Sequence, residues 1–92
     1  MIQNFLHDGL ANFFFTGSTA GINSQHAKRL KLLLAKLNTS KDLRDMNFPG
    51  ANLHKLKGNK KNFWGVKVSG NWRVIFRLEM GDVFDVDYLD YH

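Results

Sequence analysis

The second half of the chain alternates apolar and polar residues with a period of two, which is typical of β-strands buried on one face. Three segments show the alternation, at residues 64–68, 72–78 and 84–88, and a shorter segment begins near residue 52. Turn-forming sequences separate them at Gly58-Asn59, Ser69-Gly70-Asn71 and Met80-Gly81-Asp82. The pattern predicts an antiparallel meander of four strands, with Phe84, Val86 and Tyr88 as the apolar set of the last strand.

The first half of the chain has the spacing of an amphipathic helix. Asn23 or Ser24 can cap a helix that runs to about Leu37, with leucines on one stripe and basic residues off it. Residues 10–15 predict one or two further helical turns, residues 2–7 a short first strand, and residues 41–51 a loop with some helical turn. In a chain of 92 residues this is one α+β domain, residues 1–92, with helices packed on one sheet face.

The strand register follows from the requirement that the apolar residues share one face. Both hairpins then need odd loops of about three residues. With that register Lys67 lies opposite Arg73, and Arg73 lies opposite Leu89 with Tyr91 as a diagonal neighbour. We therefore expect Lys67, Arg73 and Tyr91 to share the face away from the core. The same parity puts His92 on the other face, although a free chain end can curl.

The net charge of +5 is distributed unevenly. No Asp or Glu occurs between Met46 and Leu78, whereas five carboxylates crowd into the last fourteen residues. The basic residues of the acid-free block are Lys55, Lys57, Lys60, Lys61, Lys67, Arg73 and Arg77. Such a block favours an anionic partner, and Lys55, Lys60, Lys61 and Lys67 are candidate contacts to RNA or the ribosome. The alternative is a solvated face whose basic and acidic strands neutralise each other.

Several classes of function are excluded by composition and spacing. The chain has no cysteine, so disulfides and thiolate metal sites are ruled out. The four histidines are scattered, no HExxH motif occurs, and no glycine-rich phosphate loop precedes the helix, so we expect neither a metal nor a cofactor. The apolar run at residues 13–15 is too short for a signal peptide or a membrane span. We expect a cytoplasmic protein.

The residues best suited to chemistry lie at the chain end, Asp90-Tyr91-His92, and in two internal motifs, Leu53-His54-Lys55-Leu56-Lys57-Gly58 and Asn71-Trp72-Arg73. Two imidazoles, an amine and a guanidinium are enough to cut RNA without a metal. Each residue also has a structural interpretation. His54 can be a partly buried strand residue, Lys57 a turn lysine, Arg73 an ion-pair partner of Asp87 or Asp90, and Tyr91 and His92 frayed terminal residues.

These motifs, with Phe63-Trp64, Asn71-Trp72-Arg73-Val74-Ile75-Phe76, Gly81-Asp82-Val83 and Tyr88-Leu89-Asp90-Tyr91-His92, resemble the HigB toxins, a branch of the RelE/ParE superfamily. The opening Met1-Ile2, Phe5, His7 and Gly9-Leu10 fits as well, and residues 41–49 match least. The resemblance implies a small RelE-like fold, with two helices against a curved, mainly antiparallel sheet.

The resemblance also implies a toxin of a type II toxin–antitoxin system that cleaves messenger RNA in the ribosomal decoding site. Carried over by motif position, the active-site set is His54, Lys57, Arg73, Asp90, Tyr91 and His92. The implied partner is a HigA antitoxin, a helix-turn-helix protein whose complex with the toxin binds the promoter of the operon.

For the chemistry we expect attack by the ribose 2′-OH on the adjacent phosphodiester, which leaves a 2′,3′-cyclic phosphate. His92 is the first choice of general base or acid, and His54 shares that role or orients the phosphate. Arg73 grips phosphate oxygens, Lys57 adds a charge, Asp90 orients an imidazole or Arg73, and Tyr91 stacks on a base or donates to a phosphate. The alternatives are a ParE-like inhibitor of a protein target and an RNA- or ribosome-binding module without catalysis.

Overall fold

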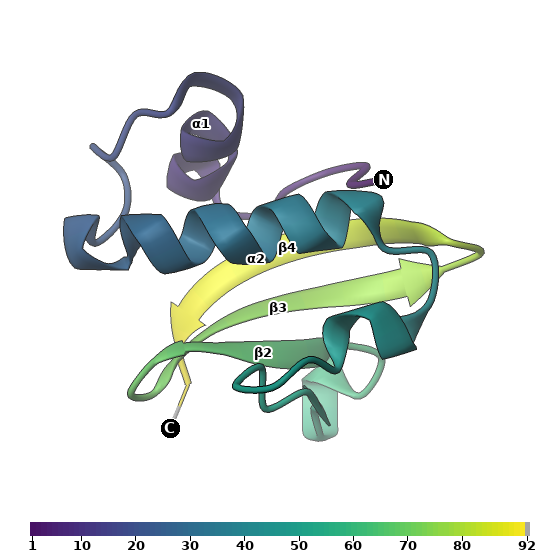
Figure 1. Cartoon of the computed structure of the whole chain (residues 1–92). Helices are drawn as coiled ribbons and strands as arrows, with labels where there is room; N and C mark the ends of the chain where they lie inside the picture. Colours follow the sequence, from purple (N-terminus) through teal and green to yellow (C-terminus); the bar gives the residue numbers. More distant parts are fainter. Residues whose placement is uncertain (92) are drawn as a thin grey trace.

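The computed structural model describes residues 1–91, and within them two α-helices precede a single sheet. The helices are α1 (Asp8–Thr16) and α2 (Ala27–Thr39), and the short 3-10 turns are η1 (Ser24–His26), η2 (Leu43–Met46) and η3 (Gly58–Lys60). The antiparallel strands β1 (His54–Lys55), β2 (Trp64–Ser69), β3 (Trp72–Glu79) and β4 (Asp82–Asp90) lie side by side in chain order. Both α-helices cover the same face of the sheet (Figure 1), so the predicted α+β class is confirmed.

The helices begin and end where side chains or glycine satisfy the free backbone groups. The His7 Nδ1 accepts the N–H of Leu10 at 2.9 Å at the start of α1, and Gly17 ends this helix with φ 81°. The Asn23 side chain accepts the N–H of Gln25 at 3.0 Å and starts η1, which leads into α2. The predicted cap at Asn23 is therefore confirmed, with one 3-10 turn before the α-helix.

The hydrophobic core lies between α2 and the sheet. The leucine stripe of α2 is almost fully buried, as its spacing predicts: Leu30, Leu33, Leu34 and Leu37. These leucines pack against alternate residues of the three long strands: Val66, Val74, Phe76, Val83, Val86 and Tyr88. The opposite face of the sheet therefore belongs to the intervening strand residues, and we call it the outer face.

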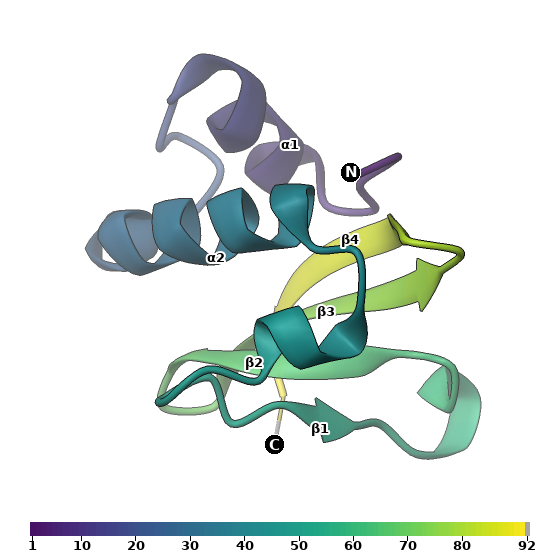
Figure 2. The same cartoon turned by 45° about the vertical axis from the view of Figure 1, so that its right-hand side comes forward.

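The segment at residues 2–7 is extended, but it forms only two isolated parallel bridges instead of the predicted strand. Ile2 pairs with Val83 and Phe5 with Val86, which places the segment along the free edge of β4. Gln3 N–H donates to Val83 O at 2.7 Å and Leu6 N–H to Val86 O at 2.8 Å. The segment thereby covers one sheet edge, while Figure 2 shows the short β1 at the other edge.

The predicted register is correct around Arg73, although the loops that produce it are not the predicted ones. Lys67 lies opposite Arg73, and Arg73 lies opposite Leu89. The turns leave only two residues between the paired positions Ser69–Trp72 and Glu79–Asp82, so the expectation of three-residue loops was wrong. Each hairpin instead contains a bulge farther along, and the extra bulge residue restores the parity that a longer loop would give.

The bulge in β4 corrects one assignment from the sequence. Asp85 has φ 55° at this bulge, and the alternation of faces changes phase across it. Val83 therefore occupies the core face with Val86, whereas Phe84 pairs with Arg77 and lies beneath its guanidinium on the outer face, at 5.4 Å. Phe84 was predicted in the core set because a strict period of two has no place for the extra residue.

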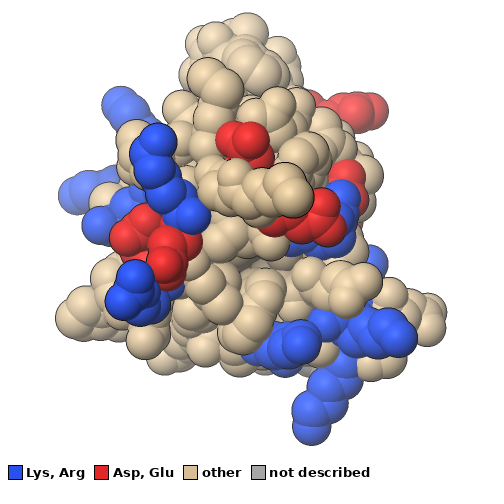
Figure 3. Space-filling view, turned by 90° about the vertical axis from the view of Figure 1, so that its right-hand side faces the viewer, with Lys and Arg blue, Asp and Glu red and all other residues tan. Residues whose placement is uncertain are grey.

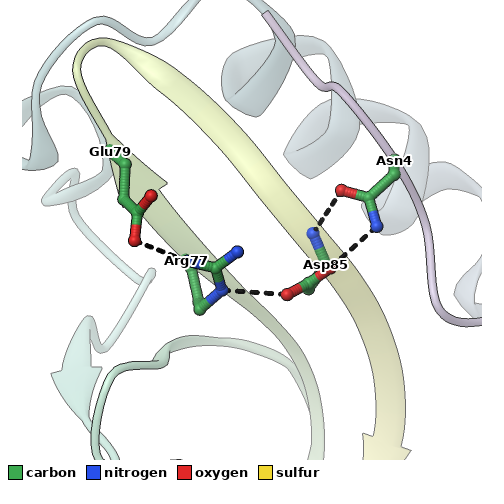
Figure 4. A network of polar contacts seen from close by, with 4 residues as sticks. All are labelled: Asn4, Arg77, Glu79 and Asp85. Carbon is green, nitrogen blue, oxygen red and sulfur yellow. Dashed lines mark hydrogen bonds and ion pairs between the residues drawn. The ribbon is translucent and has the colours of Figure 1, made fainter.

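A polar network holds the bulge between the first segment and β3 (Figure 4). The Asn4 amide donates to the Asp85 carboxylate at 2.7 Å, and Asp85 N–H donates to Asn4 Oδ1 at 2.9 Å. Arg77 Nε donates to the other carboxylate oxygen at 2.9 Å, and Arg77 also pairs with Glu79. These contacts lower the pKa of Asp85, the bond from Asn4 contributing most and that from Arg77 next.

Substituting Asp85→Asn should reduce the acid sensitivity of the fold. Because the pKa of folded Asp85 lies below its ordinary value of 3.8, the ionised carboxylate stabilises the fold above that pH, and the contribution is lost as the pH falls through the lowered value. Asparagine tolerates the positive φ at this position, so the substitution tests the charge with little backbone strain. Urea unfolding at pH 7 and at acid pH should show a smaller loss for the variant, and equal losses would contradict the assignment.

Candidate active site

The candidate site lies on the outer face, where the strand register aligns two rows of residues. In one row His54 lies opposite Gly65, Gly65 opposite Ile75, and Ile75 opposite Asp87. In the neighbouring row Lys67, Arg73 and Leu89 lie opposite one another in turn. The structure therefore places His54, Lys67 and Arg73 on the same face of the sheet, although they come from three different strands.

His54 is half-buried, and its hydrogen bonding fixes its tautomer. Its Nδ1 lies 3.0 Å from the carbonyl oxygen of Asn52, and because a carbonyl can only accept, Nδ1 carries the proton. The neutral ring then has its lone pair on Nε2, which has no hydrogen-bond partner among residues 1–91. His54 is thus arranged as a proton acceptor.

Tyr91 lies next to His54, in line with its predicted place on the outer face. The centroids of the two rings are 6.4 Å apart, and Tyr91 N–H donates to the carbonyl oxygen of Asn71 at 2.8 Å. This bond extends the pairing of β4 with β3 by one residue, to Asn71 in the turn between β2 and β3. The Tyr91 side chain is partly exposed, so its ring and hydroxyl are accessible beside the imidazole.

Within residues 1–91, the Arg73 guanidinium is hydrogen-bonded to backbone carbonyls. Its Nη1 donates to Gly70 O at 2.7 Å and to Trp72 O at 3.1 Å, and its buried Nε has no partner in the described part of the chain. No ion pair of the described residues joins Arg73 to Asp87. Arg77, four residues farther along β3 on the same face, is held by Asp85 and Glu79. Among residues 1–91, the contacts of Arg77 are therefore to carboxylates, whereas those of Arg73 are to backbone carbonyls.

The remaining predicted residues lie at the edges of this arrangement or outside it. Asp90 is exposed and pairs with Trp72 at the end of β4. The alternation along the strand therefore assigns it to the core face of the sheet, not to the outer face. Lys57 is exposed just before η3, and no described contact links it to His54 or Arg73. His92 lies outside the described residues.

The predicted RNA-contacting lysines cluster mainly around β1 and η3. Lys55 lies 6.0 Å from the Trp64 ring and Lys60 lies 5.3 Å from the Phe63 ring, while Lys61 is exposed at the end of η3. Figure 3 shows only Lys and Arg among the charged residues at the lower edge of its view, where Figures 1 and 2 place β1 and η3. Lys67 is separate from this cluster and lies opposite Arg73.

The two other histidines have structural roles. His7 accepts from the N–H of Leu10 through Nδ1, so its neutral ring carries the proton on Nε2, the reverse of His54. His26 is buried and its Nδ1 lies 2.6 Å from the hydroxyl of Tyr88. Burial raises the pKa of Tyr88, which keeps this hydroxyl protonated and able to donate to His26.

No described group of three or more His, Asp or Glu side chains is arranged to hold a metal ion. Nor is any helix within residues 1–91 of sufficient length and hydropathy to cross a membrane. A groove of about 380 Å³ lies between α1 and α2, on the helical side of the sheet, and none of the candidate residues lines it. The residues that line it are Phe13, Phe14, Gly17, Lys31, Leu34 and Ala35. The candidate residues lie on the opposite side of the sheet from this groove.

Sequence reasoning missed the residues that position His54. Asn52, whose carbonyl fixes the tautomer, has no sequence signal apart from its nearness to His54. Gly65 carries a signal that could have been used, because a glycine inside an alternating strand indicates a bulge or a close approach. Ile75 is fully buried on the outer face beside it.

Comparison with known proteins agrees with this geometry. A family model described as the RelE-like toxin of the type II toxin–antitoxin system HigB matches residues 3–92. The chain is also 35% identical over 92 residues to Endoribonuclease HigB of Proteus vulgaris, and the alignment covers the whole of both chains. With a fold of two helices on an antiparallel sheet, this chain belongs to the HigB family of RelE-like toxins.

Proposed function

We propose that this toxin is a metal-independent endoribonuclease that cleaves messenger RNA on the ribosome. The observation that carries the proposal is the outer face, where the available Nε2 of His54 lies beside Tyr91 and where Arg73 is not held by a described ion pair. The name of the Proteus vulgaris relative, an endoribonuclease, supports the same class of activity. The resemblance to HigB toxins supplies the ribosome as the place of action.

In the proposed reaction the ribose 2′-OH attacks the adjacent phosphorus. The bond to the 5′ oxygen of the next nucleotide breaks, leaving a 2′,3′-cyclic phosphate and a 5′-OH. One imidazole takes the proton of the 2′-OH and another donor protonates the departing oxygen. His54 and His92 are the candidates for these two roles. The Nδ1 bond to Asn52 suits neutral His54 to the role of base, because it leaves Nε2 as the proton acceptor.

Arg73 is proposed to stabilise the negative charge that develops on the phosphate oxygens. Its buried Nε has no partner among residues 1–91, and a buried donor left unpaired costs stability, which a purely structural arginine would be expected to avoid. Lys57 and Lys67 add positive potential near this face, and Asp90 orients an imidazole near the chain end. Tyr91 can stack on a base or donate to a phosphate.

The remaining basic residues are proposed to bind the ribosome or the message. Lys55, Lys60 and Lys61 lie around β1 and η3, in a stretch of chain without carboxylates. Family membership implies an antitoxin partner. We propose that this partner is a HigA-type helix-turn-helix protein, that operator DNA is bound only through the complex, and that the toxin acts in the cytoplasm.

Induced expression without the antitoxin should arrest growth and cut messenger RNA within translated regions. Primer extension on RNA from the culture would map the cuts, and end-group analysis should find 2′,3′-cyclic phosphates. A strain that expresses the His54→Ala variant is the matched control. Arrest with intact messenger and trapped gyrase–DNA complexes would contradict the proposal and favour a ParE-like inhibitor. Ribosome binding without new RNA ends would favour a module without catalysis.

Arg73→Ala should lower the cleavage rate by roughly 10²–10³, because one cation that stabilises the transition state is lost. Its melting temperature should change little, since the hydrogen bonds removed are to backbone carbonyls at an exposed turn. Arg77→Ala is the matched control on the same strand and face: it removes described ion pairs, so it should lose some stability and retain cleavage. A large fall in stability for Arg73→Ala without a change in rate would show that Arg73 is structural.

Variants of the two candidate histidines should separate proton transfer from positioning. His92→Gln keeps hydrogen bonding but does not titrate near neutral pH, and deletion of His92 removes the imidazole entirely. Both should cleave far more slowly than the wild type, and His54→Ala should remove one limb of the pH–rate profile. If both His92 variants cleave at the wild-type rate, His92 is neither acid nor base, and His54 remains as the proton carrier.

A further inference from the structure

Gly65 occupies a position where nothing in the backbone requires glycine. It lies within β2, is buried, and is not among the glycines with positive φ. Glycine inside a strand is unfavourable, because it gains nothing from packing and loses more conformational freedom on folding than other residues. Glycine therefore lowers the stability of β2 at this position. The side chains nearest to the missing Cβ are those of His54 and Ile75.

The imidazole of His54 lies where a side chain of residue 65 would begin. An ideal Cβ on Gly65 would be 3.2 Å from His54 Cε1, 3.5 Å from His54 Nε2 and 3.5 Å from Ile75 Cγ2. His54 and Gly65 are directly paired across the strands, so the ring lies over the glycine. A methyl group there would be in tight contact with Cε1 and in ordinary van der Waals contact with Nε2, the atom assigned to accept a proton.

A second contact holds the same ring at Nδ1. The Asn52 carbonyl accepts from Nδ1 at 3.0 Å, and Asn52 has φ 49°, in the left-handed region that asparagine tolerates better than most residues. The ring is thus restrained at Nδ1 by a hydrogen bond, and the missing side chain leaves room for it at Cε1. Restraint of this kind is what holds a catalytic group in reacting geometry.

We propose that Gly65 is a positioning residue for catalysis, because its lack of a side chain provides the seat that holds the His54 imidazole with Nε2 free. The inference rests on the proposed function, in which His54 exchanges a proton with RNA. It assigns Gly65 no contact with the substrate. It explains why a buried position near the start of β2, opposite the fully buried Ile75, carries glycine instead of a β-branched residue.

The test compares Gly65→Ala with Gly65→Val, each alone and Gly65→Ala also in a His54→Ala background. The alanine Cβ requires the ring to move by a few tenths of an ångström, and the partly exposed ring is able to do so. We expect the cleavage rate to fall about tenfold for Gly65→Ala and on the order of 10² for Gly65→Val. The melting temperature of Gly65→Ala should equal or exceed that of the wild type, since alanine is the better strand residue.

The double variant distinguishes positioning from other roles. In the His54→Ala background Gly65→Ala should cause no further loss of rate, because the ring that it displaces is absent. An equal loss in both backgrounds would overturn the proposal, since the glycine would then act independently of His54. Wild-type rates in both Gly65 variants would overturn it as well.

Proton NMR titration of the His54 ring in the free protein provides a readout that needs no RNA. The Cε1 proton resonance of His54 should shift in Gly65→Ala, because the new methyl group contacts that atom, and an unchanged resonance would overturn the proposal. If the wild type cleaves no RNA but the NMR change occurs, the proposed function fails, while the role of Gly65 in placing the His54 ring is supported. If the wild type cleaves RNA but the His54 resonance is unchanged in Gly65→Ala, the role of Gly65 fails, while the proposed function is supported.

Discussion

The register of β2, β3 and β4 is the constraint on which the outer face depends. A slip by one residue would turn every side chain of a strand to the opposite face, exchanging Arg73 for Val74 and Gly65 for Val66. The core prevents this slip, because Val74, Phe76 and Val86 can be buried only if they face α2. Hydrophobic burial on one face therefore fixes the polar arrangement on the other, and the two bulges adjust the parity where the tight turns would otherwise disturb it.

The acidic residues near the chain end serve the fold more than they neutralise the basic block. Asp85 is bonded to Asn4 and Arg77, and Asp82 lies 3.5 Å from the amino group of Met1. The idea that acidic and basic strands cancel each other is therefore correct for Arg77. It does not extend to Arg73, which no ion pair among residues 1–91 holds. The lysines around β1 and η3 are exposed or packed on aromatic rings. The cationic surface that persists is the one suited to an RNA backbone.

The described histidines show how one side chain acquires different roles from its partners. His7 accepts an N–H at a helix start, His26 is buried against Tyr88, and His54 donates to a carbonyl at the sheet edge. Of these three, only the last arrangement combines a neutral ring's Nε2 acceptor with a partly exposed position on the outer face. Gly65, Asn52 and Tyr91 complete that arrangement from three separate segments.

The sequence by itself determined the fold class, the leucine stripe of α2, the strands and the pairing of Arg73 with Lys67 and Leu89, because each follows from a local period and from burial of one face. The set of candidate residues came from motif resemblance, and the structure brings His54 and Tyr91 together. Only the tertiary structure decided the bulge that moves Phe84 outward, the tautomer of His54 and the place of its ring over Gly65. These features arise from contacts between residues far apart in the chain, or from one extra residue in a strand, and a periodic pattern contains neither.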